Sequence, residues 1–99
     1  MNRKGADILV VEDNMYMNIA LQTLVTSFVE SCDYATDGEE ALQYVKTKYE
    51  QDGSTYKLII MDYEMPICNG LDASRKIRDY LAKRTPQAQK QPCIILTAV

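Results

Sequence analysis

Short strand-like runs that alternate with segments of helical periodicity constrain the fold of this chain more than any other feature. The runs span residues 8–11, 31–35, 57–62 and 93–98. Two of them contain the continuous apolar stretches ILVV and LIIM, which are typical of strands buried on both faces of a parallel sheet. Strands that alternate with helices build such a sheet with helices on both of its faces. We therefore predict a single α/β domain with a doubly wound parallel sheet.

Three helices are expected between these strands, over about 14–29, from Asp37 to the break at 51–55, and over 71–83. Asn14 or Asp13 can cap the first helix, and Asp37 can cap the second. The side chains expected to be buried recur at spacings of three and four. They are Met17, Leu21, Leu24, Val25 and Phe28 in the first helix, Ala41, Leu42, Val45 and Tyr49 in the second, and Ile77, Tyr80 and Leu81 in the third.

Composition narrows the location and the class of function. The chain has 99 residues, of which 46% are hydrophobic, and no apolar stretch approaches the roughly 20 residues of a membrane span. Its start lacks the pattern of a secretory signal, so we expect a cytoplasmic protein without membrane contact of its own. The net charge of −3 offers no basic surface for a phosphate backbone, which argues against nucleic-acid binding through this chain.

The absence of histidine limits the possible chemistry. It excludes serine–histidine and cysteine–histidine catalysis, and it excludes a phosphohistidine within this chain. Cys32, Cys68 and Cys93 are widely spaced and have neither CxxC spacing nor histidine partners, so we interpret them as reduced thiols. If phosphoryl transfer occurs here, the histidine must belong to a partner.

Polar residues follow three of the four predicted strands. Glu12 and Asp13 follow the first strand, Asp62 ends the third and Thr97 ends the fourth. Any one of them alone could be a helix cap or a solvated strand end. Because ligands bind beyond the carboxyl ends of strands in doubly wound sheets, we expect the set to converge on one site. Clustered carboxylates repel one another, and oxygen ligands of this kind suit Mg²⁺ better than zinc. A metal-bound carboxylate at a strand tip could also act as a nucleophile towards phosphorus.

Three motifs carry a family resemblance. ILVVEDN at 8–14, IIMDYEMPICNG at 59–70 and IILTA at 94–98, in this order and spacing, resemble the receiver domain of response regulators and hybrid histidine kinases. The resemblance covers essentially the whole chain, and it is the combination of the motifs that is specific. It implies a flavodoxin-like (CheY-like) fold with strand order 2-1-3-4 for the strands present here. It also implies a partner, which is a histidine kinase or a histidine phosphotransfer protein.

The resemblance assigns roles to the polar residues at the strand ends. Asp62 matches the phosphoacceptor, and Thr97 matches the switch hydroxyl that moves towards the phosphoryl group. Asp13 matches a direct ligand of Mg²⁺, Glu12 a ligand through water, and Glu64 the position whose backbone carbonyl completes the metal shell. Met65, Pro66 and Gly70 match the loop that shapes the site. The protein would be a switch, with at most self-phosphorylation and self-dephosphorylation as enzyme activity. The chain could also be part of a longer, membrane-attached hybrid kinase.

One departure from the family pattern matters. The pattern continues with helix 4, strand 5 ending in a lysine that pairs with the phosphoryl oxygens, and helix 5, so we expect the receiver domain of residues 1–99 to be incomplete at its C-terminal side. Lys90 precedes the last strand and is expected at the opposite edge of the sheet. The strand at 93–98 would then be an exposed apolar edge open to self-association, with too few helices to cover one face.

The residues are also compatible with two other functions. A degenerate receiver that acts only as an interaction module is suggested by the missing lysine. A phosphohydrolase of the haloacid dehalogenase type also uses a nucleophilic aspartate with Mg²⁺ at a strand end. That family needs a second aspartate two residues after the first, and this chain has Glu64 there.

Overall fold

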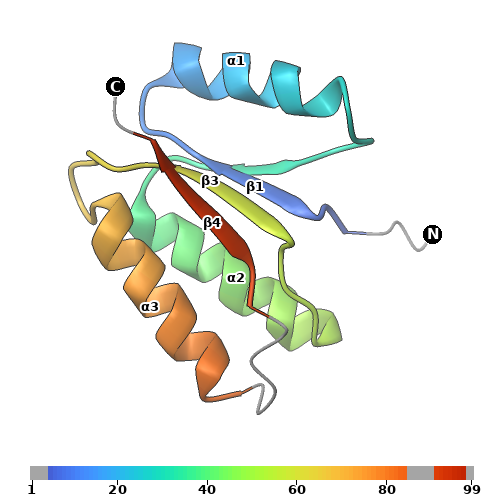
Figure 1. Ribbon diagram of the computed structural model, residues 1–99, viewed down its shortest axis with the longest axis vertical. Helices are drawn as coiled ribbons and strands as arrows, with labels where there is room; N and C mark the ends of the chain where they lie inside the picture. The colour runs from blue at the N-terminus through green and yellow to red at the C-terminus, as the bar shows by residue number, and fades with distance from the viewer. Residues whose placement is uncertain (1–4, 85–90, 98–99) are drawn as a thin grey trace.

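A parallel four-stranded sheet forms the centre of the molecule (Figure 1). The structure is a computed structural model and describes residues 5–84 and 91–97. The strands are β1 (Ile8–Val11), β2 (Asp33–Ala35), β3 (Leu58–Asp62) and β4 (Cys93–Thr97), in the order β2-β1-β3-β4. The helices are α1 (Met15–Thr26), α2 (Gly38–Asp52) and α3 (Gly70–Ala82). The predicted fold class and strand order are confirmed, while Ala98, which we assigned to the last strand, lies outside the described residues.

The two central strands are apolar because both of their faces are covered. Leu9, Val10 and Val11 of β1 have no exposed surface, and β1 pairs with β2 on one side and β3 on the other. Alternate residues point to opposite faces. Leu9 and Val11 therefore join the core beneath α2 and α3, and Val10 faces α1.

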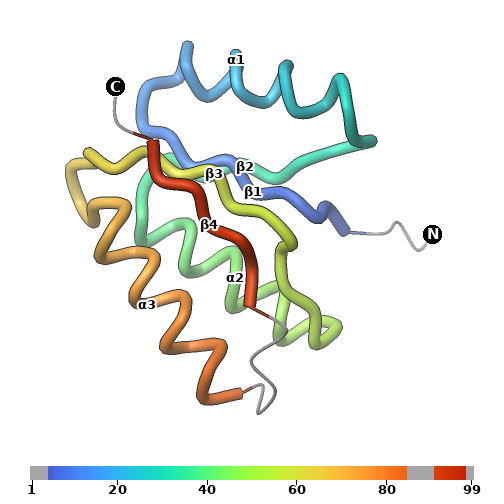
Figure 2. The backbone as a smooth tube through the Cα atoms, viewed as in Figure 1, coloured from blue at the N-terminus to red at the C-terminus, as the bar shows by residue number. Residues whose placement is uncertain are grey.

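The faces of the sheet are covered unequally. Helices α2 and α3 lie side by side on one face, whereas α1 lies alone on the other, as Figure 2 shows. The larger core therefore belongs to the α2–α3 side, where Ala41, Val45, Ile77, Tyr80 and Leu81 are buried as predicted. No described helix has both the length and the apolar character needed to cross a membrane.

The predicted buried stripe of α1 is largely wrong. Val25 is buried and Leu21 half-buried, but Met17, Leu24 and Phe28 are 40%, 59% and 83% exposed. The helix also ends at Thr26, earlier than the predicted 29. Because no second described helix lies beside α1, only the side of α1 that touches the sheet is covered. Met17 and Leu24 lie on the uncovered side of α1 and Phe28 lies just beyond its end, where only a packed neighbouring helix would bury them.

A polar residue, Asn18, takes the central buried position on α1. Its side chain has no exposed surface, and its Nδ2 donates to the carbonyl oxygens of Glu12 at 2.9 Å and Ala35 at 3.0 Å. Gln22 in turn donates to Asn18 Oδ1 at 2.7 Å. Asn18 thus ties α1 to the ends of β1 and β2, immediately beneath the acidic segment at residues 12 and 13.

The helix starts follow the capping rules. Asn14 accepts from the backbone N–H of Met17, and Asp37 accepts from that of Glu40, so the two predicted caps are confirmed. Asn69 caps α3 in the same way by accepting from the N–H of Asp72 at 2.9 Å. Each cap fixes the direction in which a helix leaves the carboxyl edge of the sheet.

We expect Asn18→Ala to lower the free energy of unfolding by about 2 kcal/mol, because two buried carbonyl groups lose their donor. Chemical denaturation followed by circular dichroism measures the loss. Thr23→Ala is the matched control, because it also removes a side-chain hydrogen bond from α1 but at an exposed position. Equal effects of the two substitutions would contradict the role given to Asn18.

Candidate functional site

The structure brings together the three acids that were predicted to converge. One carboxylate oxygen each from Glu12, Asp13 and Asp62 lies within 4.8 Å of the others. The cause is the sheet itself: β1 and β3 are parallel neighbours, so the residues at and beyond their carboxyl ends meet at one edge. Three carboxylates in this space repel one another unless a cation or a proton intervenes.

Glu12 is the most constrained of the three acids. Its side chain is buried, and its Oε2 accepts from the backbone N–H of Asn14 at 3.1 Å. Burial raises the pKa of the Glu12 carboxyl, the hydrogen bond from Asn14 opposes that rise, and the nearby charges of Asp62 and Asp13 add to it. The ionised form of Glu12 is therefore costly in the absence of a cation.

Asp62 ends β3 in a half-buried position. Its Oδ1 lies 3.4 Å from the backbone nitrogen of Glu64, which is at the long end for a hydrogen bond. The carboxylate is thus only weakly held by the protein. The Glu64 side chain is exposed, and so is Asp13, which leaves this edge of the sheet open to solvent and to another molecule.

Thr97 lies next to Asp62 across the β3–β4 ladder, where the two residues are register partners. Partners in a parallel ladder present their side chains to the same face, so the Thr97 hydroxyl is a neighbour of the Asp62 carboxylate. That hydroxyl donates to the carbonyl oxygen of Met61 over 3.5 Å, which is a long contact. A hydroxyl held so loosely can turn towards a group bound at Asp62.

The loop after Asp62 is closed by a tight backbone approach. The N–H of Gly70 donates to the carbonyl oxygen of Tyr63 at 2.7 Å, and a Cβ atom at Gly70 would lie only 2.5 Å from the carbonyl oxygen of Asp62. Met65 is buried in the core while Pro66 is exposed. A glycine at position 70 is therefore required for the loop to fold back without displacing Asp62.

Two residues that hold the loop after Asp62 in place were not predicted from the sequence. Asn69, which we had not assigned a role, caps α3, and Gly38 lies against the loop, because a Cβ atom there would be 2.4 Å from the carbonyl oxygen of Cys68. The signal for Asn69 was present, since asparagine before an amphipathic segment is a common cap. The contact at Gly38 joins segments thirty residues apart and had no local signal.

Within residues 5–84 and 91–97, no lysine or arginine forms an ion pair with the three acids. The ion pairs there join Lys57 to Asp7, Lys76 to Glu39 and Lys83 to Asp79. Lys90, which we placed at the opposite edge of the sheet, lies outside the described residues. The negative charge at the carboxyl edge is therefore uncompensated by the described part of the chain.

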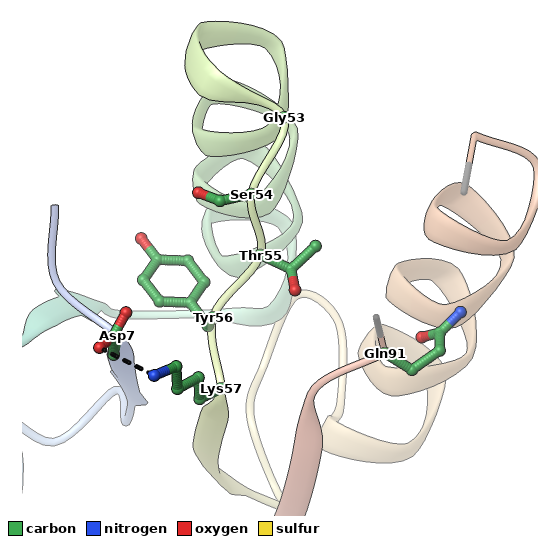
Figure 3. Close-up of a pocket in the computed structure, with 7 residues that line it drawn as sticks. All are labelled: Asp7, Gly53, Ser54, Thr55, Tyr56, Lys57 and Gln91. Carbon is green, nitrogen blue, oxygen red and sulfur yellow. Dashed lines mark ion pairs between the residues drawn. The ribbon is translucent and has the colours of Figure 1, made fainter. Parts of the chain in front are cut away.

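The opposite edge of the sheet has a different character. A cavity of about 390 Å³ lies there, lined by residues that precede β1, β3 and β4 (Figure 3). Its charged groups are Asp7 and Lys57, which pair with each other at 3.7 Å. This cavity lacks the unpaired acids of the carboxyl edge, so we place the candidate site at the latter.

The acidic cluster fits a hard divalent cation. All its donors are oxygens, the three carboxylates lie close together, and two of them are at least partly open to solvent. Mg²⁺ prefers such ligands and keeps several waters, which the open side of the site can accommodate. Nitrogen and sulfur donors, which zinc sites usually include, are absent from the cluster.

Comparison with known proteins agrees with this architecture. The family model of the response regulator receiver domain matches residues 8–99. The chain is 35% identical over 86 residues to the osmosensing histidine protein kinase SLN1 of Saccharomyces cerevisiae, a match covering 86% of this chain and 7% of that protein. It is 40% identical over 81 residues to a protein-glutamate methylesterase/protein-glutamine glutaminase of Methanococcus maripaludis, covering 80% of this chain and 20% of that protein. The chain thus spans a small part of these relatives.

Solved structures show the same fold. The receiver domain of the histidine kinase CKI1 from Arabidopsis thaliana, complexed with Mg²⁺ and BeF₃⁻, matches with a TM-score of 0.76 and 28% identity over 92% of this chain and 64% of that chain. A co-crystal structure of the Saccharomyces cerevisiae phosphotransfer protein Ypd1 and the receiver domain of Ssk1 matches with a TM-score of 0.60 and 28% identity over 95% of this chain and 62% of that chain. From its fold, its motifs and the extent of the family match, this chain belongs to the response regulator receiver domain family.

Proposed function

We propose that this chain accepts a phosphoryl group on Asp62 from a phosphohistidine of a partner protein, with Mg²⁺ bound by the neighbouring acids. The observation that carries the proposal is the convergence of Glu12, Asp13 and Asp62 at the carboxyl edge of the sheet in a receiver-family chain. The partner must supply the histidine because this chain has none.

In the proposed transfer, a carboxylate oxygen of Asp62 attacks phosphorus, a P–O bond forms and the P–N bond to the partner's imidazole breaks. The leaving nitrogen keeps the bonding electron pair and takes up a proton. Asp62 suits this role because its carboxylate is half-buried, only weakly held by the N–H of Glu64, and located beside exposed residues that leave room for a partner.

The proposed metal ligands are the carboxylates of Asp13 and Asp62, the carboxylate of Glu12 through water, and the backbone carbonyl of Glu64. When bound, Mg²⁺ would neutralise charge on the transferring phosphoryl group. The pKa of Glu12 supports this assignment, because it is raised first by burial and further by the neighbouring charges of Asp62 and Asp13, which a cation would balance. The CKI1 receiver, which shares this fold, was solved with Mg²⁺.

Thr97 is proposed as the hydroxyl that responds to phosphorylation. Its register pairing with Asp62 and its long contact with the Met61 carbonyl support a short rotation towards a phosphoryl oxygen. The same strand pairing connects the site to β4, because the N–H of Tyr63 donates to the carbonyl oxygen of Thr97 at 2.8 Å. A change in the conformation of Thr97 would therefore also affect the backbone at the carboxyl edge of the sheet.

The proposed partner is a histidine kinase or a histidine phosphotransfer protein. Met15 and Tyr16, which begin α1 directly after the acidic segment, are 53% and 87% exposed and offer an apolar contact surface beside the site. The structure of Ssk1 with Ypd1 is a precedent for such a complex in a receiver of similar fold. We propose a cytoplasmic location, where such partners present their phosphohistidines, and a role as a switch more than as an enzyme.

The phosphoacceptor role predicts a specific modification. Incubation with Mg²⁺ and acetyl phosphate should add the mass of one phosphoryl group, as measured by intact-protein mass spectrometry, because Asp62 is a half-buried carboxylate at the open carboxyl edge and lies beside the other proposed Mg²⁺ ligands. Asp62→Asn should abolish the gain, whereas Glu64→Gln should retain it, because only the backbone of Glu64 is assigned a role. An unmodified wild-type protein would instead support an interaction module without phosphoryl chemistry.

The proposed metal site predicts that replacing Glu12 or Asp13 weakens Mg²⁺ binding and lowers the stability that bound Mg²⁺ adds. Asp13→Asn and Glu12→Gln should each weaken Mg²⁺ binding by at least about tenfold, measured by calorimetric titration, with Glu64→Gln as the exposed control. In the wild type, Mg²⁺ at ten times its Kd should raise the free energy of unfolding by about 1.4 kcal/mol. This gain should be largely lost in both variants.

Without metal, Glu12→Gln should raise the free energy of unfolding at neutral pH, because it removes a buried, repelled charge. The folded protein holds the Glu12 proton more tightly than the unfolded chain, so wild-type stability from this group rises as the pH falls through the raised pKa. The advantage of the variant should therefore shrink towards and below the ordinary pKa of 4.5. No Mg²⁺ binding by the wild type would contradict the site.

We also propose that the β4 edge supports self-association. Cys93 N–H donates to Lys57, and Thr97 accepts from Tyr63, so alternate residues bond to β3 and the backbone groups of Ile94 and Leu96 point outward. Ile95 and Leu96 are 47% and 37% exposed, and β4 has no charged residue or proline to discourage pairing.

Ile95→Lys should therefore shift the protein towards the monomer in sedimentation velocity over a range of concentrations. Ile67→Lys, which makes the same change at a 70% exposed loop position, should leave the distribution unchanged. A wild-type protein that stays monomeric at every concentration would show that the edge does not associate.

A further inference from the structure

A basic cavity lies between α2 and α3, away from the acidic site. It has a volume of about 240 Å³ and is lined by Leu42, Lys46, Lys76, Asp79, Tyr80, Lys83 and Arg84. Four of these residues are cationic and one is anionic, in a chain whose net charge is −3. The cavity is therefore a local concentration of positive charge on an acidic protein.

Arg84 is held in place at the edge of this cavity. Its guanidinium stacks on the Tyr80 ring, with Cζ 3.9 Å from the ring centroid, and Nη1 donates to the carbonyl oxygen of Tyr80 at 3.2 Å. The hydroxyl of Tyr49 donates to the carbonyl oxygen of Arg84 at 3.0 Å, so the backbone of Arg84 is also fixed. Tyr49 and Tyr80 pack edge to face with their centroids 6.2 Å apart. The arginine is thus positioned before any ligand binds.

Among residues 5–84 and 91–97, only the Tyr80 carbonyl accepts a hydrogen bond from the Arg84 guanidinium, so most of its donors have no partner there. A guanidinium has five N–H donors in a rigid fork, and one contact to the Tyr80 carbonyl accounts for a single nitrogen. Within the described residues, Arg84 forms no ion pair with a carboxylate. A pre-positioned fork of this kind matches the geometry of phosphate and carboxylate oxygens.

Lys46 adds a second uncompensated charge. Its Nζ lies 5.6 Å from the centroid of the same Tyr80 ring, and it too has no carboxylate partner within residues 5–84 and 91–97. Both cations line the same cavity, so they repel each other, and an anion bound there would relieve that repulsion. Lys76 and Lys83 differ, because Glu39 and Asp79 pair with them at 3.2 Å and 3.1 Å.

We propose that the cavity between α2 and α3 is a binding site for a phosphate monoester, held by the Arg84 fork and by Lys46. A dianionic monoester suits two unpaired cations better than a singly charged carboxylate does. The site is separate from the phosphoacceptor. Helix α3 begins at Gly70, beside Asp62, and its thirteen residues extend about 20 Å to its last turn, which contains Tyr80 and is followed by Arg84. The ester could be a free small molecule or a phosphorylated side chain of a protein.

The test is a metal-free titration of the whole chain followed by amide chemical shifts in NMR. Inorganic phosphate, O-phosphoserine and a short peptide with a central phosphoserine are the probes, at constant ionic strength set with chloride. We expect saturable shifts at Tyr49, Tyr80 and Arg84. Equal affinity for O-phosphoserine and the peptide would indicate a small-molecule ligand, and a tighter peptide a phosphorylated protein.

Substitutions distinguish specific binding in this cavity from nonspecific electrostatic attraction to the protein surface. Arg84→Gln should weaken binding of O-phosphoserine about tenfold, which corresponds to one charge-assisted pair, and Lys46→Gln should weaken it less. Arg84→Lys keeps the charge but loses the fork, so it should still weaken binding. Lys57→Gln is the control, because it removes an exposed cation that pairs with Asp7 and does not line this cavity.

Three outcomes would overturn the proposal. These are the absence of saturable shifts at the cavity, equal shifts with sulfate or chloride alone, and a loss in Lys57→Gln as large as that in Arg84→Gln. Unfolding curves of each variant show whether a loss of binding comes from a loss of fold. Because Asp62→Asn should leave this binding unchanged, failure of the phosphoacceptor proposal would not affect the result.

Discussion

The pairing of β3 with β1 on one side and β4 on the other is the constraint on which the rest of the structure depends. The residues of β3 pair with β1 from Leu58 to Met61 and with β4 from Leu58 to Asp62, and because both pairings are parallel, the carboxyl ends of three strands lie at one edge. Glu12 and Asp13 follow β1, Asp62 ends β3 and Thr97 ends β4. The strand pairing alone therefore places these polar residues at the same edge. The apolar residues of β1 and β3 are what make the arrangement stable, because they bury both faces of the centre of the sheet.

The cost of this convergence is electrostatic. Three carboxylates share a small volume, the described residues offer no cation to pair with them, and Glu12 is buried as well. A structure that served stability alone would not keep these charges together, which is why perturbed acids at a strand edge indicate function. Asn18 adds to the same design, since its amide anchors α1 to the backbone of Glu12 and Ala35 directly beneath the acids. These hydrogen bonds fix the backbone that carries Glu12 relative to α1.

Much of the fold could be predicted from the sequence, because it depends on local patterns. Continuous apolar runs predicted the two central strands, Asn14 and Asp37 predicted two helix starts, and the polar strand ends predicted which acids lie together at the carboxyl edge. The prediction failed where burial depends on a neighbour: Leu24 and Phe28 have the spacing of a buried stripe, yet no described helix lies beside α1 to cover them. It also missed contacts between distant segments, such as Gly38 against the backbone of Cys68, and the buried amide of Asn18, which hydropathy patterns cannot distinguish from a surface residue.

The central claim is that the edge formed by β1 and β3 makes Asp62 a phosphoacceptor. The most direct test is to identify the modified residue after phosphotransfer from a phosphorylated histidine phosphotransfer protein in the presence of Mg²⁺. Borohydride reduction converts an acyl phosphate on aspartate to homoserine, and peptide mass spectrometry then locates it. We expect homoserine at position 62 only, and none when Mg²⁺ is chelated. Homoserine at Asp13 or another aspartate, or none under conditions that label other receiver domains, would contradict this role of Asp62.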